Sequence, residues 1–322
     1  MHAAVVAGGE VAWEVRPDPV PGTHEILVRV EAAGLNAADL LQRAGRYPPP
    51  SGAPADIPGL ECAGTVVETG PRVERFAVGD RVMGLLGGGG QAELAVLHER
   101  VALAVPDGVA TDAAGAFCEV FATAYDALFS QGHLASGDRL LVNGGAGGVG
   151  IAAVQLARAT GARVVASVRD ANRRAAVAEL GAVAVAPDAT RDHAPYDVVL
   201  ELVGGPNIAT DLADLATGGR VLVIGTGAGR AAELDLGTLM ARRATIRGST
   251  LRARSLEEKA TLSRNLERHV LPLLASGQLV VPIERRFACA DVASAYERFA
   301  AGAKLGKIVL VAATHSTGTA TT

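Results

Sequence analysis

The sequence predicts an α/β protein with two domains, an irregular β-barrel followed by a doubly wound parallel sheet. Three observations support this. The chain has 322 residues, which is more than a single hydrophobic core usually serves. Its first third shows short strand-like segments separated by frequent turns, whereas strand and helix patterns alternate from about residue 117 onward. A buried strand, a glycine turn and an amphipathic helix follow one another directly over residues 140–157.

The composition is that of a soluble cytoplasmic enzyme with a large aliphatic core. Apolar residues make up 49% of the chain but aromatic residues only 3%, so Ala, Val and Leu must fill the interior. A net charge of -4 gives no overall attraction to nucleic acid or to an anionic membrane. Cys62, Cys118 and Cys289 are widely spaced and odd in number, which favours reduced thiols. The start of the chain has no signal-peptide pattern, and no long uncharged apolar run predicts a membrane span.

Short strands define the expected barrel domain, which we place over residues 1–116. These segments alternate apolar and polar residues and end at turn residues. The strands cover residues 26–32, 64–70, 80–83 and 91–96.

The alternating part, residues 117–256, predicts the parallel sheet. Its strands cover residues 139–142, 163–167, 197–201, 220–224 and 245–248. Helices lie between them, including 172–180, ended by Gly181, and 208–216, ended by the pair Gly218-Gly219. A charged helix near 256–276 and a last strand over 307–311 complete the pattern. The tail 312–322 is rich in Thr and Ser and is expected to be disordered.

The glycine turn carries the most specific functional signal. Gly145, Gly147 and Gly150 fit the spacing G-x-G-x-x-G between a strand and a helix. The absent side chains permit a tight turn, close approach of a pyrophosphate and close packing of the helix on its strand. The helix N-terminus then offers unpaired N–H groups to the phosphates. The turn therefore predicts a dinucleotide-binding site.

Several further segments, taken together, resemble a known family. They are residues 34–47, 58–64, 78–82, 87–93 and 306–310. With the glycine turn, their order is similar to that of the zinc-free quinone oxidoreductases of the medium-chain dehydrogenase/reductase superfamily. Residues 41–47 and 248–254 most resemble the subgroup induced by a tumour suppressor in humans. The resemblance implies a GroES-like catalytic domain, 1–116 completed by 257–311, and a Rossmann NADPH-binding domain over 117–256. It also implies an active site in the cleft between them and a homodimer.

No metal is expected, because the ligand positions of the zinc-dependent relatives carry other residues. The chain reads Gly59-Leu60-Glu61 where those relatives have Gly-His-Glu, and Asn36 stands where they have a cysteine ligand. The glycine run 87–90 replaces the lobe that carries four cysteines.

The resemblance places two residues in the substrate pocket. Tyr47 follows Asn36 by eleven residues and is expected to act as a proton donor or as a ring clamp; otherwise it is a loop tyrosine packed beside prolines. Asn36 is expected to donate a hydrogen bond to the substrate or to the nicotinamide ribose, or else to form a turn. Asp39 and Glu61 are weaker candidates, which we expect to orient backbone groups or an arginine.

The cofactor preference depends on the end of the second parallel strand. Ser167, Arg169 and Arg173 favour the 2′-phosphate of NADPH, whereas Asp170 is the discordant residue. The resemblance implies Thr123 at the nicotinamide amide. It further assigns to the cofactor Asn143, Gly148 and Val149 near the phosphates, and Gly204, Gly225, Leu251 and Lys307 along the remainder.

Three functional hypotheses remain open. The first is an NADPH-dependent quinone reductase. The second is an enoyl or enone reductase of polyketide, lipid or aldehyde metabolism, because conjugated acceptors of both kinds take hydride at carbon and spread charge onto oxygen. The third is a non-catalytic NADPH-binding module with RNA or a protein as partner, suggested by arginines at 242, 243, 247, 252 and 254. No aromatic residues lie among these arginines for base stacking, so nucleic acid is not the expected partner.

Overall fold

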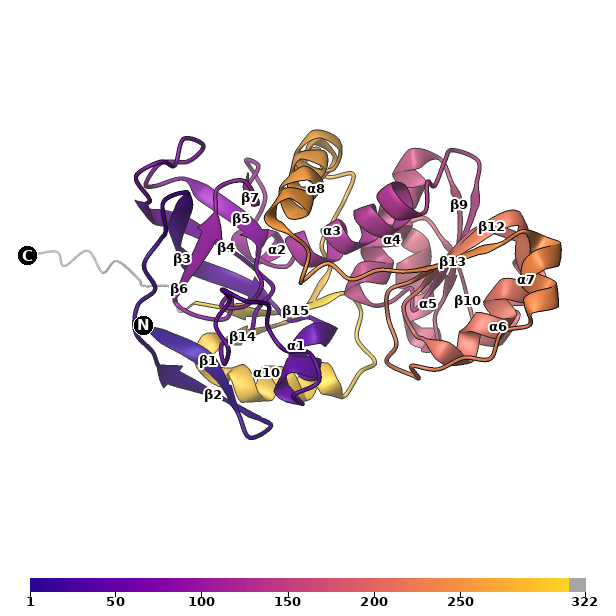
Figure 1. Ribbon diagram of the computed structural model, residues 1–322, viewed down its shortest axis with the longest axis horizontal. Coiled ribbons are helices and arrows are strands. Elements are labelled where there is room, and N and C mark those ends of the chain that lie inside the picture. Colours follow the sequence, from indigo (N-terminus) through magenta and orange to yellow (C-terminus); the bar gives the residue numbers. More distant parts are fainter. Residues whose placement is uncertain (313–322) are drawn as a thin grey trace, which may run out of the picture.

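Two β-sheets of different architecture lie side by side in the computed structural model, which describes residues 1–312 (Figure 1). One sheet belongs to the barrel and the other is parallel, so the predicted fold class is confirmed. The tail expected at 312–322 lies outside the described residues apart from Ala312, whose N–H donates to the Glu31 carbonyl at 2.9 Å. None of the helices within 1–312 is long and apolar enough to cross a membrane.

The parallel sheet has six strands in the order β10-β9-β8-β11-β12-β13. The chain runs outward in both directions from the central pair β8 and β11, and ligands of this fold bind at that switch point. The strands are β8 (Arg139–Asn143), β9 (Arg163–Ser167), β10 (Val183–Val185), β11 (Tyr196–Glu201), β12 (Leu215–Val223) and β13 (Thr245–Gly248).

Helices cover this parallel sheet. The helix after the glycine turn ends at Gly161, which adopts a left-handed backbone with φ 86°. The next helix begins where the Asp170 carboxylate accepts a hydrogen bond from the Asn172 N–H at 3.0 Å. The helices are α4 (Gly148–Thr160), α5 (Ala171–Glu179), η2 (Pro187–His193), α6 (Gly205–Ala213) and α7 (Leu236–Arg242).

Two predicted helices have different boundaries. The helix expected over 208–216 ends at Ala213, because Leu215 already pairs with Tyr196 as the start of β12. The expected ending at the glycine pair was therefore wrong; Gly218, with φ 80°, lies inside the strand. The helix expected over 256–276 is two helices, α8 (Leu256–His269) and α9 (Leu271–Ala275). Pro272 lies in the first turn of α9 and has no N–H to continue α8.

The barrel sheet has the order β14-β15-β3-β4-β5-β7, and β6 also pairs with β3. Its strands β3 to β6 are the four predicted ones, each shifted or extended by a few residues. A hairpin of β1 (His2–Ala7) and β2 (Glu10–Val15) lies beside it. The remaining elements are β3 (Glu25–Gly34), α1 (Ala37–Arg43), β4 (Glu61–Thr69), β5 (Arg81–Leu85), β6 (Leu94–His98), β7 (Ala102–Ala104) and α2 (Thr111–Ala114).

The end of the chain returns to the barrel. In Figure 1 the yellow C-terminal elements lie among the indigo and purple N-terminal ones. β15 (Lys307–Val311) pairs antiparallel with β3 and parallel with β14 (Ile283–Ala288). The short helix η3 (Cys289–Asp291) and α10 (Val292–Ala300) connect them. Residues from both ends of the chain therefore meet in one sheet.

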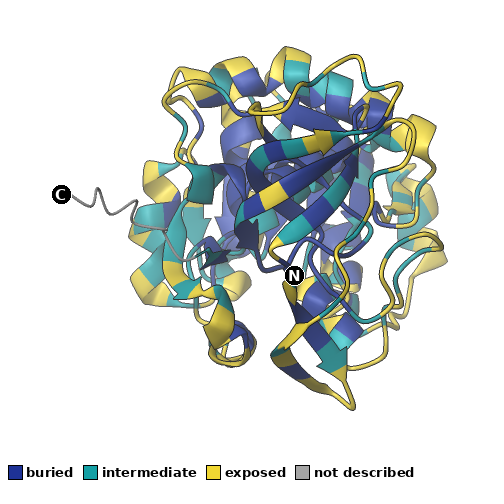
Figure 2. Cartoon of the chain, turned by 90° about the vertical axis from the view of Figure 1, so that its left-hand side faces the viewer, coloured by how far each residue is buried: buried dark blue, intermediate teal, exposed yellow. Residues whose placement is uncertain are grey.

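Helix α3 (Cys118–Tyr125), continued by η1 (Asp126–Gln131), joins the two sheets. Phe117 and Phe121 stack with ring centroids 4.5 Å apart in a core cluster that contains Met83 of the barrel and Leu140 of the parallel sheet. Figure 2 shows the buried strands surrounded by helices with exposed outer faces. Because one apolar core runs through the junction, α3 has a fixed position between the domains.

Candidate active site

The glycine turn has the shape that a dinucleotide requires. A Cβ on Gly150 would lie 2.4 Å from the Gly144 carbonyl oxygen, and one on Gly145 would lie 2.8 Å from the Ala166 side chain. A Cβ on Gly147 would meet only that same carbonyl, at 3.5 Å, so the space above Gly147 is open. Gly148 and Val149 form the first turn of α4, a helix of 13 residues whose N-terminal N–H groups face this space. The turn fits a pyrophosphate.

The end of β9 places the expected 2′-phosphate residues at different depths. Ser167 is buried, whereas Arg169 is exposed. Arg173 donates to the Ala303 carbonyl at 3.1 Å and lies 3.5 Å from the Asp170 carboxylate. Asp170 also caps α5, which accounts for the residue that looked discordant in the sequence. Arg169 is thus the cation of this group that is accessible to a phosphate.

A second set of glycines follows the strands β11 and β12. Gly204 has φ 125°, and a Cβ there would lie 2.6 Å from the Gly229 carbonyl oxygen. A Cβ on Gly225 would lie 2.2 Å from the Leu202 carbonyl oxygen. The Glu201 carboxylate accepts from the N–H groups of Val203 and Gly204. Both turns are therefore tight loops at the carboxyl ends of parallel strands, where a ligand of this fold binds.

The side chain of Asn143 lies beneath these turns and not toward the phosphates. Its Nδ2 donates to Glu201 Oε2 at 2.7 Å and to Asp211 Oδ1 at 2.8 Å. Burial, and then the charge of Glu201, raise the pKa of Asp211 to about 8. Both amide hydrogens of Asn143 are used in this buried cluster, which leaves the amide group without a further N–H for a phosphate.

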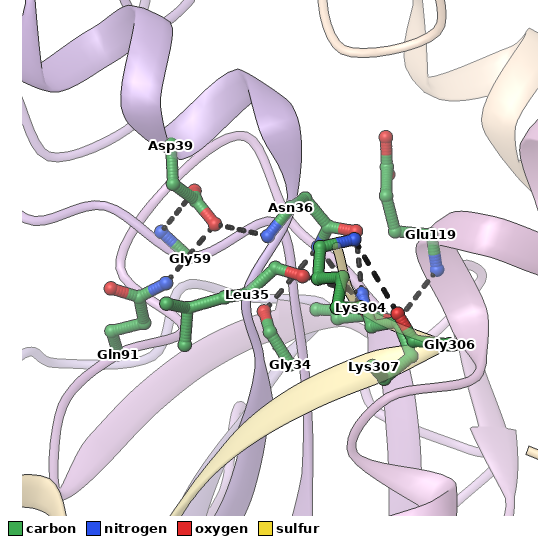
Figure 3. Close-up of polar contacts among 11 residues, drawn as sticks. Gly34, Leu35, Asn36, Asp39, Gly59, Gln91, Glu119, Lys304, Gly306 and Lys307 are labelled. Atoms are coloured by element: carbon green, nitrogen blue, oxygen red, sulfur yellow. Dashed lines mark hydrogen bonds and ion pairs between the residues drawn. The ribbon is translucent and has the colours of Figure 1, made fainter. Parts of the chain in front are cut away.

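Asn36, Glu61 and Lys307 form a buried polar cluster at the domain junction. Figure 3 shows Asn36 and Lys307 in this cluster. Lys307 Nζ donates to Asn36 Oδ1 at 2.6 Å, to Glu61 Oε1 at 2.7 Å and to the Leu35 carbonyl at 2.7 Å. Asn36 Nδ2 donates to Glu61 Oε1 at 2.9 Å and to the Gly34 carbonyl at 3.3 Å. The amide hydrogens of Asn36 and the ammonium of Lys307 are thus engaged within the protein, which differs from the substrate and cofactor contacts expected of them.

Asp39 supports this cluster from α1. Its carboxylate accepts from the Asn36 N–H at 2.8 Å, from Gln91 Nε2 at 3.1 Å and from the Gly59 N–H at 3.3 Å. The contact with Asn36 completes a capping box at the start of α1. Burial raises the pKa of Asp39 to about 6. Asp39 and Glu61 orient backbone N–H groups, as the sequence suggested, but their side-chain donors are Gln91, Asn36 and Lys307 and not the arginine that was the other expectation.

The chain returns from β15 directly onto the glycine turn. Gly306 forms a bridge with Gly147, and its N–H donates to the Ala146 carbonyl at 3.0 Å. A Cβ on Gly148 would lie 2.9 Å from Lys307 Cδ. The turn that fits the pyrophosphate therefore lies directly beside the buried polar cluster.

Tyr47 lies at the junction beneath an arginine from the other domain. The Arg252 guanidinium is 5.1 Å from the centre of the Tyr47 ring, and its Nη1 donates to the Tyr47 carbonyl at 2.9 Å. The same guanidinium donates to the Gly87 carbonyl at 2.7 Å and to Gln42 Oε1 at 2.6 Å. Leu251, beside it, is buried. Arg252 thus fixes the Tyr47 loop relative to the segment that follows β13.

Sequence reasoning missed Glu119. Its N–H donates to Glu61 Oε2 at 2.8 Å, which anchors the start of α3 to the polar cluster. Its carboxyl is directed away from Asn36 and Lys307 (Figure 3). Burial, and then the charge of Glu61, raise its pKa to about 8. Glu119 lies one helical turn before Thr123, the residue expected at the nicotinamide amide, and that spacing is the signal that was available in the sequence.

Comparisons with known proteins agree with this geometry. The alcohol dehydrogenase GroES-like domain family matches residues 22–107, and the zinc-binding dehydrogenase family matches residues 148–268. A quinone oxidoreductase of Lama guanicoe is 30% identical over 319 residues, covering 94% of both chains. The chain belongs to the quinone oxidoreductase family of the medium-chain dehydrogenase/reductase superfamily. The human quinone oxidoreductase is 28% identical over 94% of this chain and 95% of its own.

Solved structures of related proteins superpose on nearly the whole chain. A quinone oxidoreductase of Pseudomonas syringae superposes with a TM-score of 0.83 at 28% identity, covering 97% of this chain and 100% of that chain. A mycobacterial protein complexed with NADPH superposes with a TM-score of 0.84 at 27% identity, with the same coverage. A mycocerosic acid synthase-like polyketide synthase of Mycobacterium tuberculosis is 33% identical over 301 residues, but this chain spans only 14% of its length.

Other features of the chain lie away from the junction. The arginines considered for RNA binding do not form one surface, because Arg252 is buried and Arg254 pairs with Asp126 at 2.6 Å. A surface hollow of about 300 Å³ between η1 and α8 and another of about 540 Å³ near Tyr196 contain none of the predicted site residues. Among residues 1–312 no group of three His, Cys, Asp or Glu side chains could hold a metal ion.

Proposed function

We propose that this protein is an NADPH-dependent, zinc-independent reductase that transfers a hydride to a quinone in the cleft between its two domains. The observation that carries the proposal is the bridge between Gly147 and Gly306, which brings the dinucleotide turn against the polar cluster of the barrel domain. The full-length similarity to quinone oxidoreductases of about 30% identity supports the acceptor class.

NADPH, when bound, supplies the hydride. The open space above Gly147 and the first turn of α4 would receive the pyrophosphate, and Arg169 would bind the 2′-phosphate with support from Ser167 and Arg173. The turns at Gly204 and Gly225, with Thr123 and Leu251, would line the nicotinamide end. The relative complexed with NADPH supports this cofactor over NADH.

The arrangement of Lys307 supports chemistry without zinc. The Lys307 ammonium already neutralises the Glu61 carboxylate and occupies the point at which the oxygens of Asn36 and Leu35 converge. A conjugated quinone spreads the negative charge that develops on its oxygen, so hydrogen bonds and a proton donor can replace a Lewis acid. In this account Asn36 and Lys307 position α1 and the glycine turn, and Tyr47 borders the substrate.

A reductase of carbon–carbon double bonds is the second candidate. The similarity to a segment of polyketide synthases favours it, because a reductive segment in such a synthase would act on an enoyl thioester. The non-catalytic RNA-binding alternative has less support, since Arg252 and Arg254 are engaged inside the protein.

We further propose a cytoplasmic homodimer. Cys62, Cys118 and Cys289 are free thiols, as is usual in a reducing compartment. β13 is the outer strand of the parallel sheet, so one of its edges carries unpaired backbone groups. Leu236 and Met240 on the neighbouring α7 are 65% and 76% exposed. A second copy of the chain would cover this apolar edge.

The test is NADPH oxidation by the full-length protein against a matched set of acceptors, with NADH in parallel. The set contains 1,4-benzoquinone, 9,10-phenanthrenequinone, an alkenal, an enone and a crotonyl thioester. The proposal predicts the highest kcat/KM with a quinone and with NADPH. Preference for the thioester would establish the second candidate, and NADPH binding without turnover of any acceptor would favour the non-catalytic one.

A further inference from the structure

Two partly exposed residues of α3 lie on one face of an otherwise buried helix turn. Cys118, Val120, Phe121, Ala122 and Ala124 are buried, whereas Glu119 and Thr123 are not. Positions four residues apart lie on the same side of a helix. Glu119 therefore faces the region that Thr123 faces, which the proposed function assigns to the nicotinamide.

The Glu119 carboxyl is available for chemistry. Its backbone N–H is bonded to Glu61, but within residues 1–312 no group forms a hydrogen bond with the carboxyl itself. The carboxyl extends away from Asn36 and Lys307 into the junction (Figure 3). Structural carboxylates of this protein, such as Asp39, accept several hydrogen bonds each. The Glu119 carboxyl therefore differs from these structural carboxylates, because within residues 1–312 no hydrogen bond holds it in place.

Charged groups of several neighbouring elements act on Glu119, and the Arg252 guanidinium beside Tyr47 is one of those that favour its ionised form. Glu61 of β4 and Asp39 of α1 disfavour its ionised form, whereas Lys307 of β15 and Lys259 of α8 favour it. Lys259 is itself tied to the Arg252 carbonyl at 2.6 Å. Burial is the largest influence and raises the pKa of Glu119 to about 8, so the carboxyl is mainly protonated at neutral pH.

We propose that Glu119 is the acid that protonates the substrate oxygen during reduction, and that Tyr47 acts as a ring clamp. The inference rests on the proposed function. Reduction of a quinone to a hydroquinone requires the hydride, which NADPH supplies as it is oxidised, and one proton. The O–H bond of Glu119 breaks as one O–H bond of the product forms. The ring carbon that received the hydride then loses a proton to water, and the second oxygen takes up a proton from water, which completes the hydroquinone. The carboxylate that remains regains its proton from water after product release.

The comparison with Tyr47 supports this division of roles. Burial, and then the negative charge of Glu119, raise the pKa of Tyr47 above its ordinary value of 10.0. A general acid works best when its pKa lies near the operating pH. The pKa of Glu119, about 8, is closer to neutral pH than the pKa of Tyr47. Tyr47 is also restrained by Arg252 over its ring and at its carbonyl, which suits a clamp.

The first test compares Glu119→Gln, Glu119→Asp and a matched control, Glu179→Gln, at an exposed end of α5. With the preferred quinone, Glu119→Gln is expected to lower kcat at least a hundredfold and to leave the Kd for NADPH unchanged, since a positioned general acid contributes about 10²–10⁴. Glu119→Asp should recover part of the rate. Wild-type kcat should decline as pH rises through about 8, whereas the residual rate of Glu119→Gln should not.

A second measurement needs no turnover. A carboxyl whose pKa is raised by folding stabilises the protein below its ordinary value of 4.5, and this contribution is lost as pH rises to about 8. The melting temperature of cofactor-free wild type should therefore fall more over this range than that of Glu119→Gln, with Glu179→Gln following wild type.

The outcomes separate the two proposals. If wild type reduces quinones and Glu119→Gln keeps wild-type kcat and pH dependence, Glu119 is not the acid while the proposed function stands. Parallel melting profiles of wild type and Glu119→Gln would also overturn the inference. If wild type reduces no acceptor at all, the proposed function and this inference fail together. If Tyr47→Phe loses all activity while its Kd for NADPH is unchanged, Tyr47 and not Glu119 is the proton donor.

Discussion

Lys307 Nζ lies 2.7 Å from Glu61 Oε1, and this ion pair is almost completely buried, with side-chain exposures of 3% and 0%. It joins the last strand of the chain to the middle of the barrel. Because Gly306 contacts the glycine turn, the same pair also fixes the position of the dinucleotide site relative to Asn36 and Glu119.

Removing the Lys307 ammonium should destabilise the fold. Lys307→Met leaves the Glu61 carboxylate buried without its partner, so we expect a loss of about 3–5 kcal/mol in the free energy of unfolding. Urea denaturation measures this loss. The double variant Lys307→Met with Glu61→Gln removes the stranded charge and should recover part of the stability. A loss below about 1 kcal/mol in the single variant would contradict the buried pairing.

Two glycines of the turn should separate binding from folding. Gly147→Ala adds a methyl group with no close contact, so the protein should keep its melting temperature, but the methyl group enters the space assigned to the pyrophosphate. We expect the Kd for NADPH to rise at least tenfold, which fluorescence titration measures. Gly150→Ala places its Cβ 2.4 Å from a backbone oxygen and should lower stability as well, by roughly 1–3 kcal/mol. Unchanged NADPH affinity in Gly147→Ala would place the phosphates elsewhere.

Arg169 should determine the preference for NADPH over NADH. Arg169→Ala removes a charge-assisted hydrogen bond worth about 1.5–3 kcal/mol, so the NADPH Kd should rise by one to two orders of magnitude while the NADH Kd stays the same. Arg163→Ala, at the exposed opposite end of β9, is the control. Equal weakening of both cofactors by Arg169→Ala would show that this residue does not bind the 2′-phosphate.

The buried carboxyl of Asp211 should make stability depend on pH. Folding raises the pKa of Asp211 from 3.8 to about 8, so its stabilising contribution is complete below 3.8 and is lost as pH rises to about 8. In Asp211→Asn the free energy of unfolding should fall less with pH. Relative to wild type, it should rise by on the order of 1–3 kcal/mol between pH 3.8 and about 8. Urea denaturation at a series of pH values provides both profiles. Parallel profiles would show that Asp211 does not retain its proton on folding.

The proposed dimer depends on the apolar surface beside β13. Replacing Leu236 and Met240 together by lysine should convert the dimer into a monomer, because both side chains are exposed in the single chain and would be buried in the pair. Light scattering after size exclusion measures the mass. Lysine at Val78, 65% exposed on the barrel, is the control. A wild-type protein that is monomeric at all accessible concentrations would exclude the dimer.

The regular elements of the fold were predictable because their signals are local. Thr245–Gly248 and Lys307–Val311 have the predicted boundaries. In the second, an apolar run that begins directly after Lys307 specifies a short strand. The start of β12 was not predictable, because Leu215 joins the sheet only through pairing with Tyr196. Long-range pairing of this kind leaves no periodic pattern in the sequence.

The site was predictable where backbone shape determines it and less so where side chains meet from distant segments. Gly150 is required by contacts with Gly144 and Gly145, only a few residues away, whereas Gly145 is required by Ala166 on the neighbouring strand. The partners of Lys307 come from residues more than 240 positions away, so its engagement with Glu61 and Asn36 could not be derived from spacing. Glu119 lacks a sequence motif of its own. Its raised pKa results from burial and from the neighbouring charge of Glu61, which the sequence does not show.

The most direct test of the central claim is a single turnover. NADPH-loaded protein is mixed with excess 1,4-benzoquinone in a stopped-flow instrument, and the reduced nicotinamide absorbance is recorded. The account predicts a single exponential loss that saturates with quinone concentration and slows when the transferred hydrogen of NADPH is replaced by deuterium. Persistence of the absorbance while NADPH remains bound, or a faster loss with a crotonyl thioester than with the quinone, would contradict it.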